Sequence, residues 1–346
     1  MNYAEPAYPR EEVNKAGRRL CNLDGNDDEL IDAIIVIDNW RASHAYPLQL
    51  FYMNLRRRAQ CIHAAALVAQ RTKRLVSIWH KLINESNMKL SQMQDIGGCR
   101  AVLPRLHHVH ALEAVYKAER TTHEPLSSKD YIEFPKPNGY RSLHLKYRYC
   151  GIGKKAVFNG LKIEIQIRTK LQHQWATAVE AADIFTNQAL KANKGREEWH
   201  RFFALMSSVF ALRERSPLVP DTPRTLQELA KEINELNAKH HMLKTFMAYR
   251  GVIAHVEKRK DSSYYLVTLD PVAMTAQIRG FSKKESQLAN KEYTKAEEAI
   301  GSESPTKVVL VSVSSIGALR KAYPNYFLET NDFLKEINAV LNRATK

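Results

Sequence analysis

Residues 161–169 have the sequence LKIEIQIRT, in which apolar and polar side chains alternate. A period of two predicts a β-strand with one buried face and one polar face. The polar face carries Lys162, Glu164, Gln166 and Arg168, which are groups that can bind a ligand or move a proton. Most strands of this kind only present a solvated face, so this segment needs support from other parts of the chain.

Residues 130–144 have the sequence DYIEFPKPNGYRSLH, with prolines, an asparagine and a glycine at the centre. Such a composition predicts a turn at the surface, where side chains converge on a ligand rather than on a core. The turn brings cationic, amide, aromatic and imidazole groups together at Lys136, Asn138, Tyr140 and His144.

Two segments nearer the N-terminus supply further charged groups. Residues 71–82, RTKRLVSIWHKL, predict either a helix start or a strand-to-helix entry. If the segment turns helical near Ser77, three cations and a hydroxyl share one side, at Arg71, Lys73, Ser77 and Lys81. Such a set suits a triphosphate, which needs charge-assisted donors. Residues 93–102, MQDIGGCRAV, add Asp95, a glycine pair and Arg100. Singly, these are more simply a basic helix face and a loop, but together they favour a nucleotide site.

In this order the four segments resemble the synthetase domain of the RelA/SpoT family, over roughly residues 40–200. The family pattern is RxKxxxS…K, then DIxGxR, then DYIxxPKxNGYxSxH, then EIQIRT, and every fixed position is filled here. Residues 174–176, QWA, with Glu180 resemble the Trp-Ala segment that follows in such proteins. Where the family continues into a Tyr-Lys pair, this chain retains a lysine as Lys191 and lacks the tyrosine.

The resemblance implies an α+β fold, with a mixed sheet flanked by helices and related to nucleotidyltransferases. It also implies transfer of the β,γ-pyrophosphate of ATP to a ribose 3′-hydroxyl. The implied catalytic residues are Asp95 and Glu164, which would hold Mg²⁺, and Glu164 would also accept the hydroxyl proton. The implied ATP ligands are Arg71, Lys73, Ser77, Lys81 and Arg100, with the two arginines stacked on adenine. The implied acceptor ligands are Lys136, Asn138, Tyr140, His144, Gln166 and Arg168.

Two acceptors are compatible with this site. In housekeeping members of the family the acceptor is GDP or GTP, which gives the alarmone (p)ppGpp, and in several toxic members it is the 3′ end of tRNA. The net charge of +15 favours a polyanionic partner, and with it tRNA, as do the basic runs at 56–58 and 154–155. Such runs are equally compatible with solvated helix and loop faces. A catalytically silent RNA-binding or sensor module is the third possibility, and the intact Asp95 and Glu164 argue against it.

The length of 346 residues predicts about two domains. No run of about 18 apolar residues occurs and the N-terminus lacks the pattern of a signal peptide, so we expect no membrane association. The four cysteines are scattered, which favours reduced thiols in a cytoplasmic protein.

The apolar periodicity predicts helices at 28–42, 47–70, 175–182 and 199–213, and a long helix at 224–249 with Thr225 as its cap. After about residue 256 the pattern changes to strands at 264–269, 274–281 and 308–313 and a final helix at 332–341. We therefore predict a synthetase domain over residues 1–255 and a small α+β module over residues 256–346.

The C-terminal module contains YPNYF at 323–327. An isolated Tyr-x-x-Tyr is more simply a turn with aromatic anchors. However, a synthetase domain joined to such a module resembles the CapRel type of fused toxin–antitoxin, in which the second part is a zinc-finger-like fold without metal ligands. That resemblance implies that Tyr323 and Tyr326 block the nucleotide site until a phage protein, such as a capsid protein, engages the module. It places the chain among antiviral enzymes that inhibit translation.

Overall fold

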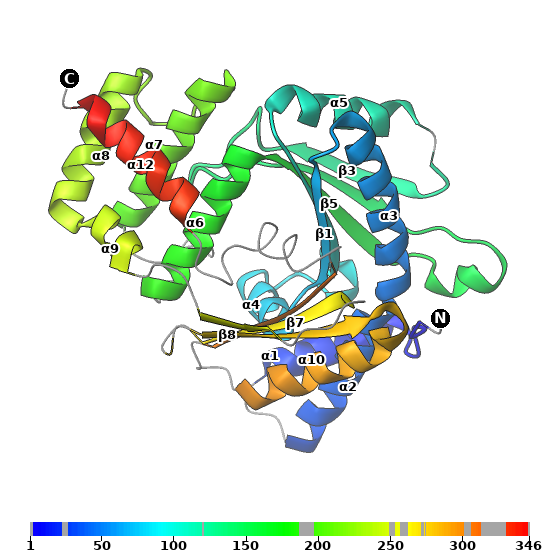
Figure 1. Cartoon of the computed structure of the whole chain (residues 1–346). Coiled ribbons are helices and arrows are strands. Elements are labelled where there is room, and N and C mark those ends of the chain that lie inside the picture. Colours follow the sequence, from blue (N-terminus) through cyan, green and yellow to red (C-terminus); the bar gives the residue numbers. More distant parts are fainter. Residues whose placement is uncertain are drawn as a thin grey trace.

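The structure is a computed structural model that describes residues 3–22, 27–119, 121–186, 197–248, 253–256, 262–270, 273, 275–300, 306–312 and 330–344. Within these residues a nine-stranded sheet has the order β3-β4-β5-β2-β1-β9-β7-β8-β6 (Figure 1). The pairs β2/β5 and β6/β8 are parallel and the other neighbours are antiparallel. This mixed sheet with flanking helices confirms the predicted α+β class.

The strands are β1 (Leu67–Thr72), β2 (Gly97–Leu103), β3 (Glu124–Asp130), β4 (Leu143–Arg148), β5 (Lys162–Thr169), β6 (Ile253–Val256), β7 (Ser262–Asp270), β8 (Thr275–Ser282) and β9 (Lys307–Ser312). The α-helices are α1 (Arg10–Cys21), α2 (Asp27–Ser43), α3 (Ala45–Ile62), α4 (Leu75–Asn84), α5 (Leu106–Ala118), α6 (Lys170–Thr186), α7 (Glu197–Glu214), α8 (Leu226–His240), α9 (Met242–Ala248), α10 (Ser286–Ile300) and α12 (Asn331–Ala344). Short 3₁₀ helices lie at Leu90–Gln92, Gly153–Phe158 and Lys283–Glu285. None of the helices in the described ranges is long and apolar enough to cross a lipid bilayer.

Helix α3 packs on the sheet through an apolar stripe in which Leu48, Phe51, Leu55 and Ala59 are buried. The expected helix at 47–70 is wrong at its C-terminal end, because α3 stops at Ile62 and the chain then forms β1. Residues 64–66 are alanines, which favour a helix, but the segment after them gains a full antiparallel ladder with β2. Tertiary pairing therefore overrides the local propensity.

The expected long helix at 224–249 is also wrong as a single element. The chain forms α8 and α9, separated at His241, which adopts the left-handed conformation with φ of 55° and ends α8. The start of α8 is as predicted, because the Thr225 hydroxyl accepts from the backbone amide of Glu228 in a capping box.

A helical layer lies beside the sheet (Figure 1). Apolar residues of α6, α7, α8 and α9 form one buried cluster, and α12, at the end of the described chain, completes it with Phe333 and Ile337. The predicted strands after residue 256 are confirmed as β7, β8 and β9, which continue the sheet from β1. The C-terminal strand β9 thus pairs with β1, and the C-terminal helix α12 shares an apolar cluster with α6 to α9.

Candidate active site

One face of the sheet collects the polar residues of the predicted motifs. In the register of the strands, Arg71 of β1 lies beside Gly98 of β2, which lies beside Glu164 of β5 and then Lys146 of β4. In the next row on the same face, Arg100 lies beside Gln166 and His144. The alternation of the four strands therefore brings motifs that are far apart in sequence onto one surface.

A chain of hydrogen bonds runs through the acceptor residues. The Arg168 Nη2 donates to the Tyr140 hydroxyl at 2.7 Å, and that hydroxyl lies 2.7 Å from the His144 Nε2. The His144 Nδ1 lies 3.0 Å from Oε1 of Glu164, and the Gln166 amide donates to Oε2 of Glu164 at 2.8 Å. All five predicted residues of this chain are thus brought together around the carboxylate.

The protonation states follow from burial. Burial lowers the pKa of His144 more than Glu164 raises it, so the imidazole is neutral at neutral pH. Because Arg168 can only donate, the directions are Arg168 to Tyr140, Tyr140 to the His144 Nε2, and the His144 Nδ1 to Glu164. Burial works to raise the pKa of Glu164, but the hydrogen bonds from His144 and Gln166 outweigh it and the pKa is lowered. Glu164 is therefore an ionised, well-oriented acceptor.

The second carboxylate lies between two lysines. The Lys73 Nζ is 2.7 Å from Oδ2 of Asp95 and the Lys81 Nζ is 3.0 Å from Oδ1. Burial works to raise the pKa of Asp95, but these two cations lower it well below its usual range. Lys73 comes from the turn between β1 and α4, and Lys81 is one helical turn beyond Ser77 on α4. Of the two arrangements predicted from the sequence, a helix start or a strand-to-helix entry, the structure shows the second.

The two carboxylates, Asp95 and Glu164, lie near one another. The charge of Asp95 works to raise the pKa of Glu164, so the carboxylates are within electrostatic reach of one another. Lys136 and Lys146 both lie in the field of Glu164, and Lys81 acts on both of them. Burial lowers the pKa of each of these two lysines and the neighbouring lysines lower it further, while Glu164 works to raise it. Clustered cations of this kind are a binding surface for a polyanion.

The turn at 135–140 is held in place from below. Gly139 has φ of 91°, and a Cβ there would lie 2.9 Å from the Ser207 side chain and 3.0 Å from the Phe203 carbonyl oxygen.

Asn138 shapes the turn, since its Oδ1 accepts from the backbone amide of Tyr140. Buried Arg141 donates to the Ser207 hydroxyl and to the carbonyl oxygens of Ile132 and Pro217. The helical layer thus fixes where Tyr140 points.

The predicted adenine-binding arginines, Arg71 and Arg100, lie on adjacent strands of the same face. Between Arg71 and Glu164 the sheet presents Gly98, and a Cβ there would meet only the Glu164 carbonyl oxygen, at 3.9 Å. The glycine therefore leaves room above the sheet between the arginine and the carboxylate. Gly97 is different, because a Cβ there would lie 2.7 Å from Ile163. Only the second glycine of the pair opens the surface.

The donor set can accommodate Mg²⁺. This ion binds through one or two carboxylates, waters and substrate phosphates, and Asp95 and Glu164 supply two carboxylates within electrostatic reach. No group of three His, Cys, Asp or Glu side chains suited to a metal occurs in the described part of the chain. An ion at this site would thus need oxygens from a phosphate ligand as well as from the protein.

Sequence reasoning missed some contributors. Lys146 and Lys129 lie on the site face of β4 and β3, and both interact with the charges around Glu164. The period of two that marks His144 also marks Lys146, so this signal was present in the sequence. Tyr323, Tyr326 and Lys191 lie outside the described residues.

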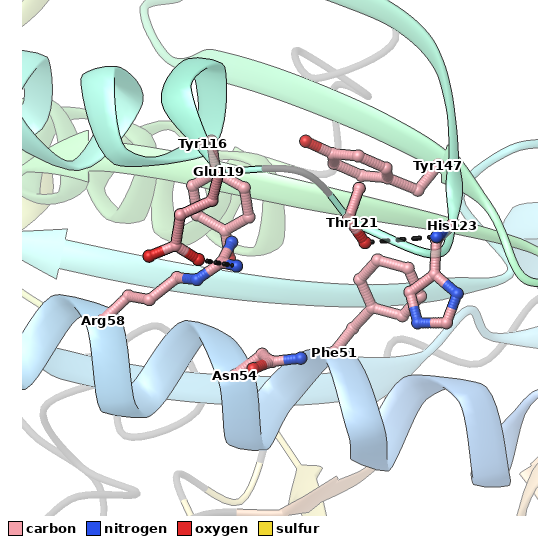
Figure 2. A pocket seen from close by; sticks show the side chains of 8 residues that line it. All are labelled: Phe51, Asn54, Arg58, Tyr116, Glu119, Thr121, His123 and Tyr147. Carbon is pink, nitrogen blue, oxygen red and sulfur yellow. Dashed lines mark hydrogen bonds and ion pairs between the residues drawn. The ribbon is translucent and has the colours of Figure 1, made fainter.

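The opposite face of the sheet carries a separate small cavity of about 20 Å³. Figure 2 shows Phe51, His123 and Tyr147 on one side of it, and the ion pair of Arg58 with Glu119 on the other. Such a volume is enough for about one water molecule. It plays no part in the polar face described above.

Two carboxylates within electrostatic reach of one another, among lysines and arginines, define a site suited to a nucleotide polyphosphate. Residues 70–189 match the family model described as "Region found in RelA / SpoT proteins". The chain therefore carries a RelA/SpoT-family synthetase domain.

Curated relatives agree with this family. The GTP pyrophosphokinase of Escherichia coli strain K12 is 28% identical over 193 residues, which are 56% of this chain and 24% of that protein. The GTP pyrophosphokinase of Photobacterium angustum is 35% identical over 168 residues, 49% of this chain and 21% of that protein. GTP pyrophosphokinase YwaC of Bacillus subtilis is 36% identical over 117 residues, 31% of this chain and 52% of that protein. The matched region thus spans about a quarter of the E. coli protein.

Solved structures are similar over half of the chain. Small alarmone synthetase 1 of Bacillus subtilis, bound to its product pppGpp, has a TM-score of 0.43 and 21% identity, covering 51% of this chain and 94% of that one. Small alarmone synthetase 2 of the same organism has a TM-score of 0.43 and 22% identity, covering 51% and 93%.

Proposed function

We propose that this protein transfers the β,γ-pyrophosphate of ATP to a ribose 3′-hydroxyl. The single observation that carries the proposal is that Asp95, just before β2, lies within electrostatic reach of Glu164 on β5, with Lys73 and Lys81 on the first carboxylate and Lys136 and Lys146 near the second. The acceptor oxygen attacks the β-phosphorus, the bond between that phosphorus and the bridging oxygen to the α-phosphorus breaks, and AMP leaves.

The cations of this face would bind the phosphates. Lys73 lies in the turn before α4, and Ser77 and Lys81 lie on α4 itself. Arg71 and Arg100 offer flat guanidinium groups for the adenine. Mg²⁺ held by Asp95 and Glu164 would offset the charge that grows on the transferred group.

The acceptor hydroxyl must lose its proton. Glu164 would take it, directly or through a water molecule, because its carboxylate is ionised and is oriented by His144 and Gln166. The neutral His144 donates its Nδ1 proton to Glu164, so it holds the carboxylate and does not compete for the proton. Tyr140, between Lys136 and Arg168, would stack on the acceptor base.

We infer that the acceptor is the 3′ end of tRNA. The net charge of +15 and the lysines beside Glu164 support a large polyanionic substrate. The second candidate is GDP or GTP, which would make the protein an alarmone synthetase. The names of the curated relatives, which are GTP pyrophosphokinases, support this alternative.

Control by the C-terminal part belongs to the same proposal. An enzyme that blocks tRNA would arrest its own host, so a restraint is required. We infer that Tyr323 and Tyr326 provide it and that a phage protein, such as a capsid protein, releases it. The CapRel-like sequence of this module supports the inference.

The acceptor experiment uses ATP labelled at the γ-phosphate with tRNA and GDP offered together. We expect label on the terminal adenosine of tRNA, and binding that weakens steeply with salt because each phosphate contact releases counterions. Label on GDP alone would assign the protein to the alarmone synthetases. The variant Glu164→Gln is the control, and it should label neither acceptor.

A further inference from the structure

A buried ion pair joins the N-terminal and C-terminal parts of the chain. The Arg41 Nη2 on α2 lies 2.6 Å from Oε2 of Glu297 on α10, and each side chain is only 4% exposed. Asp38 also accepts from Arg41, and the ring of Tyr293 lies beside the guanidinium with its centroid 5.1 Å away. Burying two charges is costly, so an ion pair of this kind is weak evidence for a gain in stability. We therefore ask which parts of the backbone it holds in place.

The second oxygen of Glu297 reaches the start of α4. Oε1 accepts from the backbone amide of Leu75 at 3.0 Å and from the Tyr293 hydroxyl at 2.8 Å. Leu75 is the first residue of α4, and the preceding Arg74 supplies no side-chain cap. The first amides of a helix have no partner within the helix. Glu297, 222 residues further along the chain, therefore caps α4 in place of a local residue.

Arg41 bonds to the backbone two residues before the first residue of this helix. Its Nε donates to the carbonyl oxygen of Lys73 at 3.1 Å, and the backbone amide of Lys73 donates to the carbonyl oxygen of Ile96 at 2.8 Å. Next to this point β9 pairs with Gln70 and Arg71. The backbone of residues 70–75 is thus fixed from both sides by contacts that end in α10 and β9.

These residues carry the cations of the candidate active site. Lys73 lies within the held segment, and Ser77 and Lys81 lie on the helix whose start Glu297 caps. A change of backbone direction at 73–75 would move both lysines away from Asp95, because each contacts it through the tip of its side chain. Figure 1 places α10 together with α1 and α2 under the sheet and away from the helical layer.

We propose that Glu297 is a positioning residue, which acts through Arg41 and the Leu75 amide to set the geometry of the phosphate-binding segment. The inference rests on the proposed function for its effect on ATP, but its effect on the backbone stands independently. In this view the C-terminal part supports the ATP site as well as restraining it. A signal that shifts α10 would reach the lysines through a continuous set of bonds.

The test compares Glu297→Gln with Glu298→Gln in the full chain. Glu298 is the next residue of α10 and is exposed. Its substitution by glutamine removes the same charge as Glu297→Gln. Hydrogen exchange measured by mass spectrometry reports on residues 70–81, and calorimetry reports binding of a non-hydrolysable ATP analogue. For Glu297→Gln we expect about tenfold faster exchange in this segment and about tenfold weaker binding, as for loss of a helix cap and a charge-assisted bond. Glu298→Gln should match the wild type in both.

A double variant separates the effect of the ion pair on the backbone at 70–81 from its effect on the free energy of unfolding. Arg41→Met with Glu297→Leu removes both charges, and such replacements commonly leave stability equal or higher. We expect unfolding as in the wild type, while exchange at 70–81 stays fast and analogue binding stays weak. Wild-type exchange at 70–81 and wild-type analogue binding in the double variant, together with wild-type unfolding, would overturn the proposal. The ion pair would then be a packing contact only. Unchanged exchange in Glu297→Gln would overturn it as well.

A milder variant covers the case of poor folding. Tyr293→Phe removes only the hydroxyl that donates to Glu297, and it should raise exchange at 70–81 by a smaller factor than Glu297→Gln. Equal exchange in Tyr293→Phe and wild type would contradict the relay. If the wild type itself fails to bind the analogue, the proposed function fails, while the exchange results still decide the role of Glu297.

Discussion

His44 gives the protein a specific sensitivity to acid. The side chain is buried at the start of α3, with Nδ1 2.7 Å from the carbonyl oxygen of Trp40. Its Nε2 is buried without a hydrogen-bond partner. Its Cβ would lie 3.5 Å from a Cβ placed on Gly97, two residues after Asp95. Protonation of His44 would therefore place an uncompensated charge in the core beneath the site.

The magnitude follows from the pKa. Burial lowers the pKa of His44 from 6.5 to about 4. At about 1.4 kcal/mol for each pH unit, this difference corresponds to about 3 kcal/mol of unfolding free energy. The unfolded chain binds the proton first, so this contribution is fully present above pH 6.5 and is lost as the pH falls toward about 4.

The assay is urea unfolding followed by circular dichroism at pH values between 7 and 4. The variant His44→Gln keeps an amide donor for Trp40 and cannot titrate. Over this range the wild type should lose about 3 kcal/mol more unfolding free energy than the variant. His107→Gln, at an exposed position on α5, is the matched control and should follow the wild type. Parallel pH profiles for the wild type and His44→Gln would refute the reasoning.

Three further predictions concern the site. Glu164→Gln and Asp95→Asn should each lower the rate of pyrophosphate transfer by at least about a hundredfold with unchanged circular dichroism, since each removes a carboxylate that would bind the metal; near-normal turnover would reject these roles. Tyr140→Ala should raise the KM for the acceptor while calorimetry finds unchanged binding of an ATP analogue, and weakened analogue binding would place Tyr140 on the wrong side. Gly139→Ala should lower the unfolding free energy by about 1 kcal/mol or more, because φ is 91° and the added Cβ meets Phe203; an unchanged denaturation midpoint would contradict this.

The site was largely predictable because its residues alternate along strands. A period of two places Glu164, Gln166 and Arg168 on one face of the strand at 161–169, and it places His144 on one face of the strand at 143–149. The register of β4 with β5 then brings these two faces together. The neighbours of that face were not predictable in the same way. Lys129 reaches the site only because β3 pairs with β4, and pairing between strands leaves no local trace in the sequence.

The predicted helix boundaries were wrong where contacts between distant parts of the chain outweighed local sequence signals. The alanines at 64–66 favour continuation of α3, but β1 begins directly after them because β2 and β9 both pair with it. The break between α8 and α9 rests on a left-handed His241, a conformation that sequence pattern does not reveal in a residue other than glycine. The bond between Arg41 and Glu297 spans 256 residues and has no motif of its own.

The proposed reaction moves two phosphates of ATP together rather than one. The most direct measurement incubates the protein with ATP labelled at both the β- and γ-phosphates and an acceptor mixture of tRNA and GDP, and then quantifies the nucleotide products. We expect AMP in equal amount to an acceptor that has gained both labels, and neither product with Glu164→Gln. Release of ADP with a singly labelled acceptor, or equal product from Glu164→Gln, would contradict it.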